Sequence, residues 1–315
     1  MYTLRQVVKG LKWSATSPNL VMREANRLYH KRLYRREYNT AGTDVMEEDW
    51  DTLVLLDACR YDMFKAQHTL PGTLTKRHSR GSHTMEFIAG NFHGRDLSDT
   101  VYVTASPILH RGLGRKYEVR FHDRIDVWAE DGWDDEHKTV LPETMTTYAL
   151  EAAERYPNKR LVVHYIQPHY PFIGFSEFTD PVTVPDPDVI ESDIWMLLMT
   201  GKLDVPRNRV WRAYRSNLDR ALPHVETLLE DLTGKVVVTA DHGNMIGERS
   251  HPVPIREWGH PPGVYTSELV TVPWLEYEAG PRKTIHAEEP DTTEPRSTVD
   301  DDVVADRLRH LGYTD

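Results

Sequence analysis

The sequence of 315 residues contains one cysteine, Cys59, and no apolar run that approaches the length of a membrane span, about 18 residues. A single cysteine excludes an internal disulfide and any zinc cluster built from cysteines. The first residues, MYTLRQVVKGLKW, lack the long apolar segment of a secretory signal. We therefore predict a cytoplasmic location, with peripheral contact to the inner face of the membrane as an option.

Lysine is also scarce, with 11 Lys against 27 Arg, while Asp and Glu outnumber all basic residues 49 to 38. Such an acidic, lysine-poor composition is typical of proteins from high-salt organisms. Residues 1–40 carry nine basic and two acidic side chains, a net charge of +7, so the rest of the chain carries −18 of the total of −11. The N-terminal segment is either a solvated helix packed on the domain or a basic surface for anionic lipid or polymer. The acidic body argues against nucleic acid as a partner.

Two apolar runs end in acidic residues. Residues 51–57 read DTLVLLD, and residues 235–243 read KVVVTADHG. Short β-branched or leucine-rich runs of this kind are typical of strands that are buried on both faces. Because ligands bind at the carboxyl ends of the strands in open α/β sheets, we expect Asp57, Asp241 and His242 to converge if the two strands are neighbours.

The remaining periodicities alternate strands with helices, which predicts an α/β fold with a mostly parallel central sheet sandwiched by helices. We expect further strands over 101–105, 160–166 and 270–277, and helices over 61–68, 141–156 and 210–232. Pro223 predicts a kink or a break in the longest helix. Pro273 suggests that the last strand is an edge strand or carries a bulge.

Two carboxylates and an imidazole are a suitable ligand set for a divalent cation such as Mn²⁺, Mg²⁺ or Zn²⁺. Asp57 alone could simply cap the helix that follows it. The Asp241–His242–Gly243 sequence at a strand end is harder to explain structurally, since Gly243 permits a close backbone approach. We therefore predict a metal site at these residues.

A nucleophile is expected close to the metal, and Thr84 is the first candidate, with Ser82 the second. The sequence SRGSHT places both hydroxyls just before a predicted helix over 85–89. The N-terminus of a helix offers free N–H groups to a phosphate or sulfate oxygen, and a divalent ion lowers the pKa of a nearby hydroxyl. The structural alternative is that Ser82 or Thr84 only caps the helix.

Two histidines could bind a substrate oxyanion or protonate a leaving group. His169 follows a predicted strand and lies between two prolines in HYIQPHYPF. His260, in REWGHPPGVY, lies 18 residues after His242 and could close the site from the other side. His164, within the strand, is expected to be a core histidine. Arg60 and Arg80 are weaker candidates for oxyanion contacts, since surface arginines are common. Cys59 is expected to be a small buried side chain.

These motifs in this order resemble the alkaline phosphatase superfamily, and most closely its sulfatase-like and lipoteichoic-acid-synthase-like branch. The resemblance covers about residues 50–277 and includes HYIQPHYPF, VVVTADHG and WGHPPGVYTSELVTVPWLEY. It implies a catalytic domain over 46–280, preceded by a basic helical segment (1–45) and followed by an acidic mobile tail with a short helix (281–315). It also implies that one metal is bound by Asp57, Thr84, Asp241 and His242, that Thr84 is phosphorylated in turnover, and that His169 binds substrate.

The chain departs from that family in two respects. Cys59 is followed by RYDM, which is not the context in which sulfatases form formylglycine. The two-metal members use an Asp-x-x-x-His pair for their other metal, and the one such pair here, Asp306 and His310, lies outside the region of resemblance. We therefore expect a single metal, with His169, His260 or an arginine taking over the role of the second.

The predicted function is metal-dependent phosphoryl transfer from a phosphodiester, or a related phosphate or sulfate ester, through a covalent intermediate on Thr84. A hydrolase and a transferase share this first half-reaction, so the sequence does not distinguish between the two activities. One alternative is a sulfuric ester hydrolase without formylglycine. The other is a non-catalytic subunit that docks on anionic lipid or polymer through residues 1–40.

Overall fold

The computed structural model describes residues 18–113, 116–129, 131–175, 178, 194–288 and 299–313. Residues 1–17 of the predicted N-terminal segment and residues 289–298, 314 and 315 of the predicted tail lie outside the described residues. The strands are β1 (Thr52–Leu56), β2 (Thr73–His78), β3 (Arg95–Thr104), β4 (Val119–Asp126), β5 (Trp133–Asp134), β6 (Thr139–Val140), β7 (Arg160–Tyr165), β8 (Lys235–Thr239), β9 (Met245–Arg249), β10 (Arg256–Gly259) and β11 (Thr271–Glu278). The helices are α2 (Pro18–His30), α3 (Tyr61–Gln67), α4 (Thr84–Asn91), α5 (Ile108–Gly112), α6 (Pro142–Arg155), α8 (Ile194–Thr200), α9 (Arg207–Asp231), α10 (Ser267–Val270) and α11 (Asp301–His310).

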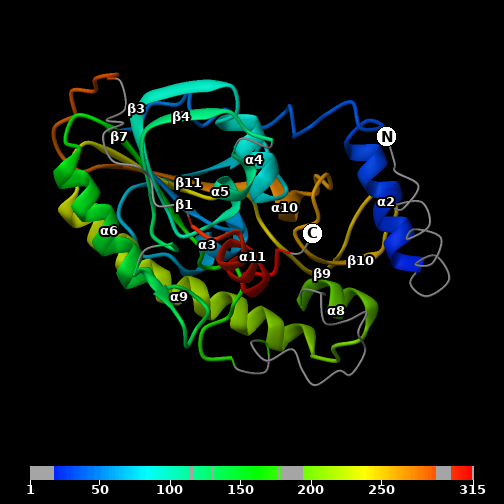
Figure 1. The fold of residues 1–315 in the computed structure, drawn as a ribbon. Helices are drawn as coiled ribbons and strands as arrows, with labels where there is room; N and C mark the ends of the chain where they lie inside the picture. Colours follow the sequence, from blue (N-terminus) through cyan, green and yellow to red (C-terminus); the bar gives the residue numbers. More distant parts are fainter. Residues whose placement is uncertain are drawn as a thin grey trace.

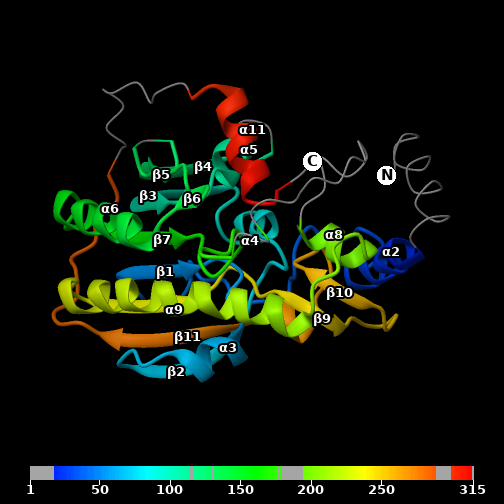
Figure 2. The ribbon, with the colours of Figure 1, turned by 90° about the horizontal axis from the view of Figure 1, so that it is seen from below.

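The central sheet has seven strands in the order β2-β11-β8-β1-β7-β3-β4 (Figures 1 and 2). The five strands from β8 to β4 are parallel, whereas β11 runs antiparallel to both of its neighbours. The predicted α/β fold with a mostly parallel sheet is therefore confirmed. The two runs that end in acidic residues are neighbours, since Thr52 of β1 pairs with Val236 of β8.

The sheet core follows from the apolar runs. All five residues of β1 are buried, and so are the four residues 236–239 of β8. Helices α6 and α9 run along one face of the sheet, and α4 lies on the opposite side (Figures 1 and 2). Both long helices present an apolar stripe to the sheet, which in α9 includes Leu218, Leu222, Val225 and Leu229.

Pro223 does not break its helix, and Pro273 does not lie in an edge strand. Helix α9 is a single helix with Pro223 inside it, so the predicted break is absent from this described element. Pro223 lies on the exposed side of α9, where water can satisfy the carbonyl that its ring leaves without an N–H partner. Strand β11 is internal rather than an edge strand, and Pro273 pairs with β2 just beyond the segment that pairs with β8.

Candidate active site

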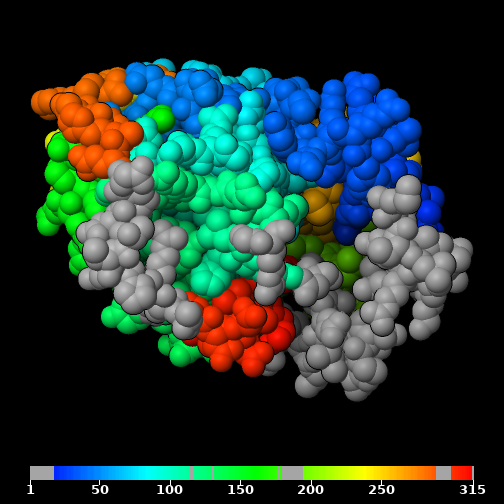
Figure 3. Space-filling view, turned by 45° about the horizontal axis from the view of Figure 1, so that its top comes forward, coloured from blue at the N-terminus to red at the C-terminus, as the bar shows by residue number. Residues whose placement is uncertain are grey.

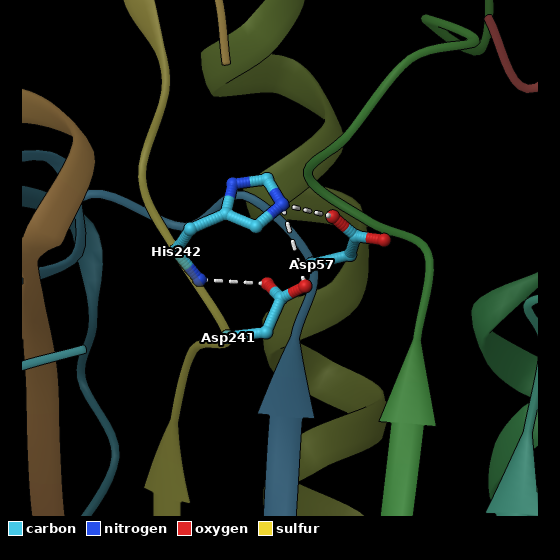
Figure 4. Close-up of side chains that lie close together, drawn as sticks. All are labelled: Asp57, Asp241 and His242. Atoms are coloured by element: carbon cyan, nitrogen blue, oxygen red, sulfur yellow. Dashed lines mark hydrogen bonds and ion pairs between the residues drawn. The ribbon is translucent and has the colours of Figure 1, made fainter. Parts of the chain in front are cut away.

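The carboxyl ends of β1 and β8 bring Asp57, Asp241 and His242 together. One ligand atom from each of the three side chains lies within 4.8 Å of the other two, and all three residues are fully buried (Figure 4). His242 Nε2 lies 3.5 Å from Asp57 Oδ1 and 3.3 Å from Asp241 Oδ2. Gly243 permits a close approach of two backbone segments here, because a Cβ at this position would lie 2.1 Å from the carbonyl oxygen of Glu268.

Hydrogen bonds fix the outer atoms of this cluster and leave one inner oxygen of each carboxylate without a partner among the described residues. Asp241 Oδ1 accepts from the backbone N–H groups of Ala58 at 3.1 Å and His242 at 2.8 Å. His242 Nδ1 lies 2.8 Å from the carbonyl oxygen of Gly243, so Nδ1 carries the proton and Nε2 presents a lone pair. Asp57 Oδ1 and Asp241 Oδ2 have no hydrogen-bond partner among the described residues.

These three inner atoms fit a divalent cation. Two carboxyl oxygens without hydrogen-bond partners and an imidazole lone pair face one another in a buried space, an arrangement that costs free energy unless a cation or a proton is present. The backbone contacts on the far side of Asp241 and His242 are the outer contacts that orient metal ligands in proteins. The residues present therefore fit the metal that the sequence motifs indicate.

The electrostatics of the buried groups are consistent with this arrangement. Burial and the charge of Asp241 raise the pKa of Asp57 well above its usual range. Burial opposes ionisation of Asp241 as well, but His242 and His164 hold the pKa of Asp241 below its ordinary value. Burial also lowers the pKa of His169 and of His164 to about 4, so both imidazoles are neutral at pH 7 and can act as ligands or hydrogen-bond partners.

Thr84 is the hydroxyl that reaches the cluster. It is the first residue of α4 and is fully buried, with its Oγ1 3.3 Å from His242 Nε2. The cap of α4 is His83, whose Nδ1 accepts from the backbone N–H of Met85 at 3.1 Å. Because His83 supplies the cap, the hydroxyl of Thr84 is not needed for that purpose.

Ser82, the second candidate, is engaged elsewhere. Its hydroxyl lies 3.0 Å from Glu86 Oε2 and 3.0 Å from the carbonyl oxygen of Pro261, and it accepts from the backbone N–H of Gly263 at 3.0 Å. These contacts join the loop before α4 to the loop that follows β10. The geometry therefore favours Thr84 over Ser82 as a nucleophile.

His169 and His260 form a hydrogen-bonded pair beside the cluster. Their Nε2 atoms are 2.7 Å apart, and the rings of His260 and His242 have centroids 4.7 Å apart. His169 Nδ1 lies 2.5 Å from the carbonyl oxygen of Tyr170 and so carries a proton. His169 Nε2 is then the acceptor in the pair, and His260 Nε2 is the donor.

The side chain of Asn217 on α9 holds the loop that carries His169. Its Nδ2 donates to the carbonyl oxygens of His169 at 2.9 Å and Pro171 at 2.8 Å, and its Oδ1 accepts from the N–H of Ile173 at 3.0 Å. The helix thus fixes the position of His169 from behind.

Arg60, Arg80 and Cys59 have structural contacts. Arg60 is paired with Glu248 at 2.7 Å and Asp62 at 2.6 Å. Arg80 is paired with Asp44 at 2.8 Å. Cys59 is fully buried, and burial raises the pKa of its thiol, which makes the thiolate scarce.

The structure adds two residues that sequence reasoning did not place in the site. His164 Nε2 lies 3.8 Å from Asp241 Oδ2 and 4.0 Å from Asp57 Oδ2, while its Nδ1 is 2.7 Å from the hydroxyl of Tyr102. A histidine near the end of a strand that neighbours β1 was a usable signal. Tyr313, near the C-terminus, donates to Asp57 Oδ2 at 3.0 Å, and nothing in its local sequence indicated this.

Comparison with known proteins gives matches among solved structures only. No protein-family model matches the chain, and no curated protein sequence matches it. The chain is similar to the soluble domain of lipooligosaccharide phosphoethanolamine transferase A from Neisseria meningitidis, with 12% identity, a TM-score of 0.40, and coverage of 72% of this chain and 76% of that one. It is also similar to the periplasmic domain of EcEptC from Escherichia coli in complex with Zn, with 13% identity, a TM-score of 0.45, and coverage of 86% and 85%.

A third match is a protein of the alkaline phosphatase superfamily from Vibrio parahaemolyticus, with 12% identity, a TM-score of 0.42, and coverage of 85% of this chain and 71% of that one. This is the superfamily that the sequence motifs resemble. At these identities and TM-scores the likeness concerns only the arrangement of the chain. The function is inferred from the residues of the site.

The comparisons contradict the predicted cytoplasmic location. The matched domains from Escherichia coli and Campylobacter jejuni are described as periplasmic. The prediction used the lack of long apolar segments, but the composition of a domain does not record the side of the membrane on which it folds. Within the described ranges, no helix is long and apolar enough to cross a bilayer.

Proposed function

We propose that the protein catalyses phosphoryl transfer from a phosphodiester, with Thr84 as the nucleophile. The observation that carries the proposal is the position of the Thr84 hydroxyl, 3.3 Å from His242 Nε2 and therefore at the edge of the cluster of Asp57, Asp241 and His242. A buried hydroxyl beside two carboxylates and a neutral imidazole is a costly arrangement for a purely structural role. It is well suited to attack on a charged ester.

Asp57, Asp241, His242 and Thr84 would hold one divalent ion. When bound, that ion supplies positive charge that lowers the pKa of the Thr84 hydroxyl and offsets charge on the phosphoryl oxygens. Asp241 and His242 are already oriented for this task by their backbone contacts, so little reorganisation of these two side chains is needed. Mn²⁺, Mg²⁺ and Zn²⁺ all remain candidates, since the site contains both oxygen and nitrogen ligands.

In the proposed reaction, the bond from Thr84 Oγ1 to phosphorus forms in line as the bond to the leaving oxygen breaks. The hydroxyl proton of Thr84 ends on the leaving oxygen, so the step is balanced. The pair of His169 and His260 is proposed as the relay that carries this proton, because both rings are neutral and share a hydrogen bond. Water or an acceptor alcohol then takes the phosphoryl group from Thr84.

The surroundings of the site favour an anionic substrate with an apolar part. A pocket of about 540 Å³ is lined by His83 and His260, by Arg23 and Arg27 of α2 and by Lys31 just after that helix, and its lining also includes Glu37 and Glu86. Tryptophans from α8 and β10 complete its wall. We therefore propose that basic residues of the N-terminal segment contact the substrate. Docking of residues 1–40 on anionic lipid stays a separate prediction.

The test combines the metal content of the purified protein with turnover of bis-p-nitrophenyl phosphate, p-nitrophenyl phosphate and p-nitrophenyl sulfate, each with added Mn²⁺, Mg²⁺ or Zn²⁺. We expect about one metal per chain and diester turnover. Thr84→Ala should reduce that turnover by about a thousandfold or more, while Thr84→Ser, which keeps a hydroxyl, should retain part of it. Mass spectrometry of the quenched wild-type reaction should find the phosphoryl adduct on Thr84.

Diester turnover that is undiminished in Thr84→Ala would overturn the proposed nucleophile. Turnover of the sulfate ester alone would favour the alternative of a sulfuric ester hydrolase. Metal-free protein without any turnover would favour a non-catalytic binding protein.

A further inference from the structure

The last described turn of the chain directs one side chain into the site. Helix α11 ends with two bonds, from the N–H of Gly312 to the carbonyl of Arg309 at 3.0 Å and from the N–H of Tyr313 to the carbonyl of Leu308 at 2.8 Å. Gly312 has φ +78°. This is the Schellman pattern of helix termination, in which glycine reverses the chain direction. The turn is thus a defined structure, and it points Tyr313 back under the helix.

Tyr313 contacts three of the proposed functional residues at once. Its hydroxyl donates to Asp57 Oδ2 at 3.0 Å and lies 3.3 Å from Thr84 Oγ1. Its ring is stacked on that of His169, with centroids 5.3 Å apart and an interplanar angle of 8°. Because Tyr313 donates its one hydrogen to Asp57, its oxygen can only accept from Thr84, whose hydroxyl lies equally close to His242 Nε2, at 3.3 Å. The nucleophile is therefore in contact with the tyrosine.

The pocket beside the site ends at this tyrosine. Tyr313, His83 and His260 line the pocket, whereas Thr84 and Asp57 are not among its described lining residues and are fully buried. A phosphorus atom that enters from the pocket can reach Thr84 Oγ1 only after the phenol has moved. The ring occupies the space beside Thr84 and His169 that the phosphoryl group needs in the proposed reaction.

The rest of α11 is anchored independently of Tyr313. The guanidinium of Arg307 lies 4.2 Å from the ring centroid of Trp133 and 3.3 Å from Asp135, and Leu308 and Leu311 are buried. The outer side of α11 lies at the molecular surface (Figure 3). A rotation about Gly312 can therefore remove the phenol from the site while the helix stays in place.

We propose that Tyr313 is a displaceable plug that closes the active site from the pocket side. This inference rests on the proposed function, since it takes Thr84 as the nucleophile. A tyrosine that only oriented Asp57 would need its hydroxyl there, but it would not need to cover His169 or engage Thr84. The three contacts together describe an autoinhibitory closed state.

The test compares Tyr313→Ala with Tyr313→Phe, which keeps the ring and loses the hydroxyl, and with Arg309→Ala on the exposed side of the same helix. Two quantities are measured: kcat/KM for bis-p-nitrophenyl phosphate with metal, and the rate at which diethyl pyrocarbonate modifies His169 in metal-free protein, followed by mass spectrometry. The exposed His286 serves as the internal reference. Thermal melting establishes that each variant is folded.

We expect Tyr313→Ala to raise both quantities by about tenfold or more, because the fraction of open sites limits both. Tyr313→Phe should lie between this variant and the wild type, and Arg309→Ala should match the wild type. Unchanged modification of His169 in Tyr313→Ala would overturn the plug. Faster modification with a lower kcat/KM would also overturn it and would make Tyr313 a positioning residue for Asp57. If even the wild type turns over no diester, the proposed function fails, and the modification rate alone decides whether Tyr313 covers the site.

Discussion

The substitution Asp241→Asn distinguishes the contribution of Asp241 to metal binding from its contribution to the stability of the fold. Oδ1 of Asp241 accepts two backbone N–H groups, so the asparagine oxygen must take that position. The new NH₂ group then takes the place of Oδ2, 3.3 Å from the lone pair of His242 Nε2, where it can donate a hydrogen bond. The substitution thus removes a carboxylate oxygen, Oδ2, that has no hydrogen-bond partner among the described residues, relieves the repulsion of Asp57 and adds a hydrogen bond.

In metal-free protein, this exchange should increase the free energy of unfolding by about 1 to 3 kcal/mol, the usual cost of an unsatisfied buried polar group. The lower part of the range applies if Asp57, whose pKa is raised by burial and by Asp241, already carries a proton that relieves the repulsion. In the presence of metal the wild type should become more stable than the variant. A metal at 100 times its dissociation constant stabilises the wild type by about 2.7 kcal/mol, and the variant should gain almost nothing.

The assay is calorimetric melting of wild type and Asp241→Asn, with chelator and with each of the three metals. Asp306→Asn, an exposed aspartate on α11, is the matched control and should follow the wild type. If Asp241→Asn melts lower than the wild type without metal, or shows the same rise with metal, the assignment of Asp241 as a ligand is refuted.

Two further predictions concern residues that hold the surroundings of the site in place. Asn217→Ala leaves three polar groups of the His169 loop without their partner, so it should lower the free energy of unfolding by about 2 to 4 kcal/mol and reduce kcat. A melt combined with steady-state kinetics checks this, and retained kcat would refute the role of Asn217. Partial burial by itself raises the pKa of Glu248, but Arg60 holds that pKa below its ordinary value. This contribution to stability is present above the unfolded pKa and lost as the pH falls through the folded one, so the melting temperature should drop below about pH 5. Glu248→Gln should flatten that part of the profile, and an unchanged profile would refute the argument.

The sequence was informative where burial imposes a pattern. The apolar runs of β1 and β8 are buried on both faces, which made their positions predictable, whereas their pairing was a condition that only the structure establishes. Because each run ends in an aspartate, the meeting of Asp57, Asp241 and His242 followed from the pairing. His169 was selected for its place after a strand and His260 for its short distance along the chain from His242, and the structure brings them together.

Other features left little trace in the local sequence. Strands β2 and β4 are the two edges of the sheet, and their residues are mostly polar and partly exposed, so no alternation marked them. Tyr313 reaches Asp57 from 256 residues away, through a turn at Gly312 that a local pattern does not connect to any partner. Pro223 was expected to kink or break α9. The helix is not broken, because a proline on the exposed side of a helix removes one hydrogen bond that water can replace.

The strand order also sets the timing of site formation during folding. The neighbours of β1 come from residues 160–165 and 235–239, so the two carboxylates meet only after a loop of more than 180 residues has closed. Such long-range pairing makes folding slow and places it late in synthesis. A divalent ion therefore cannot assist the early stages of folding, because its ligands are still far apart. It stabilises the sheet only after β8 has paired with β1. Metal added to refolding protein should slow unfolding and leave the rate of folding almost unchanged.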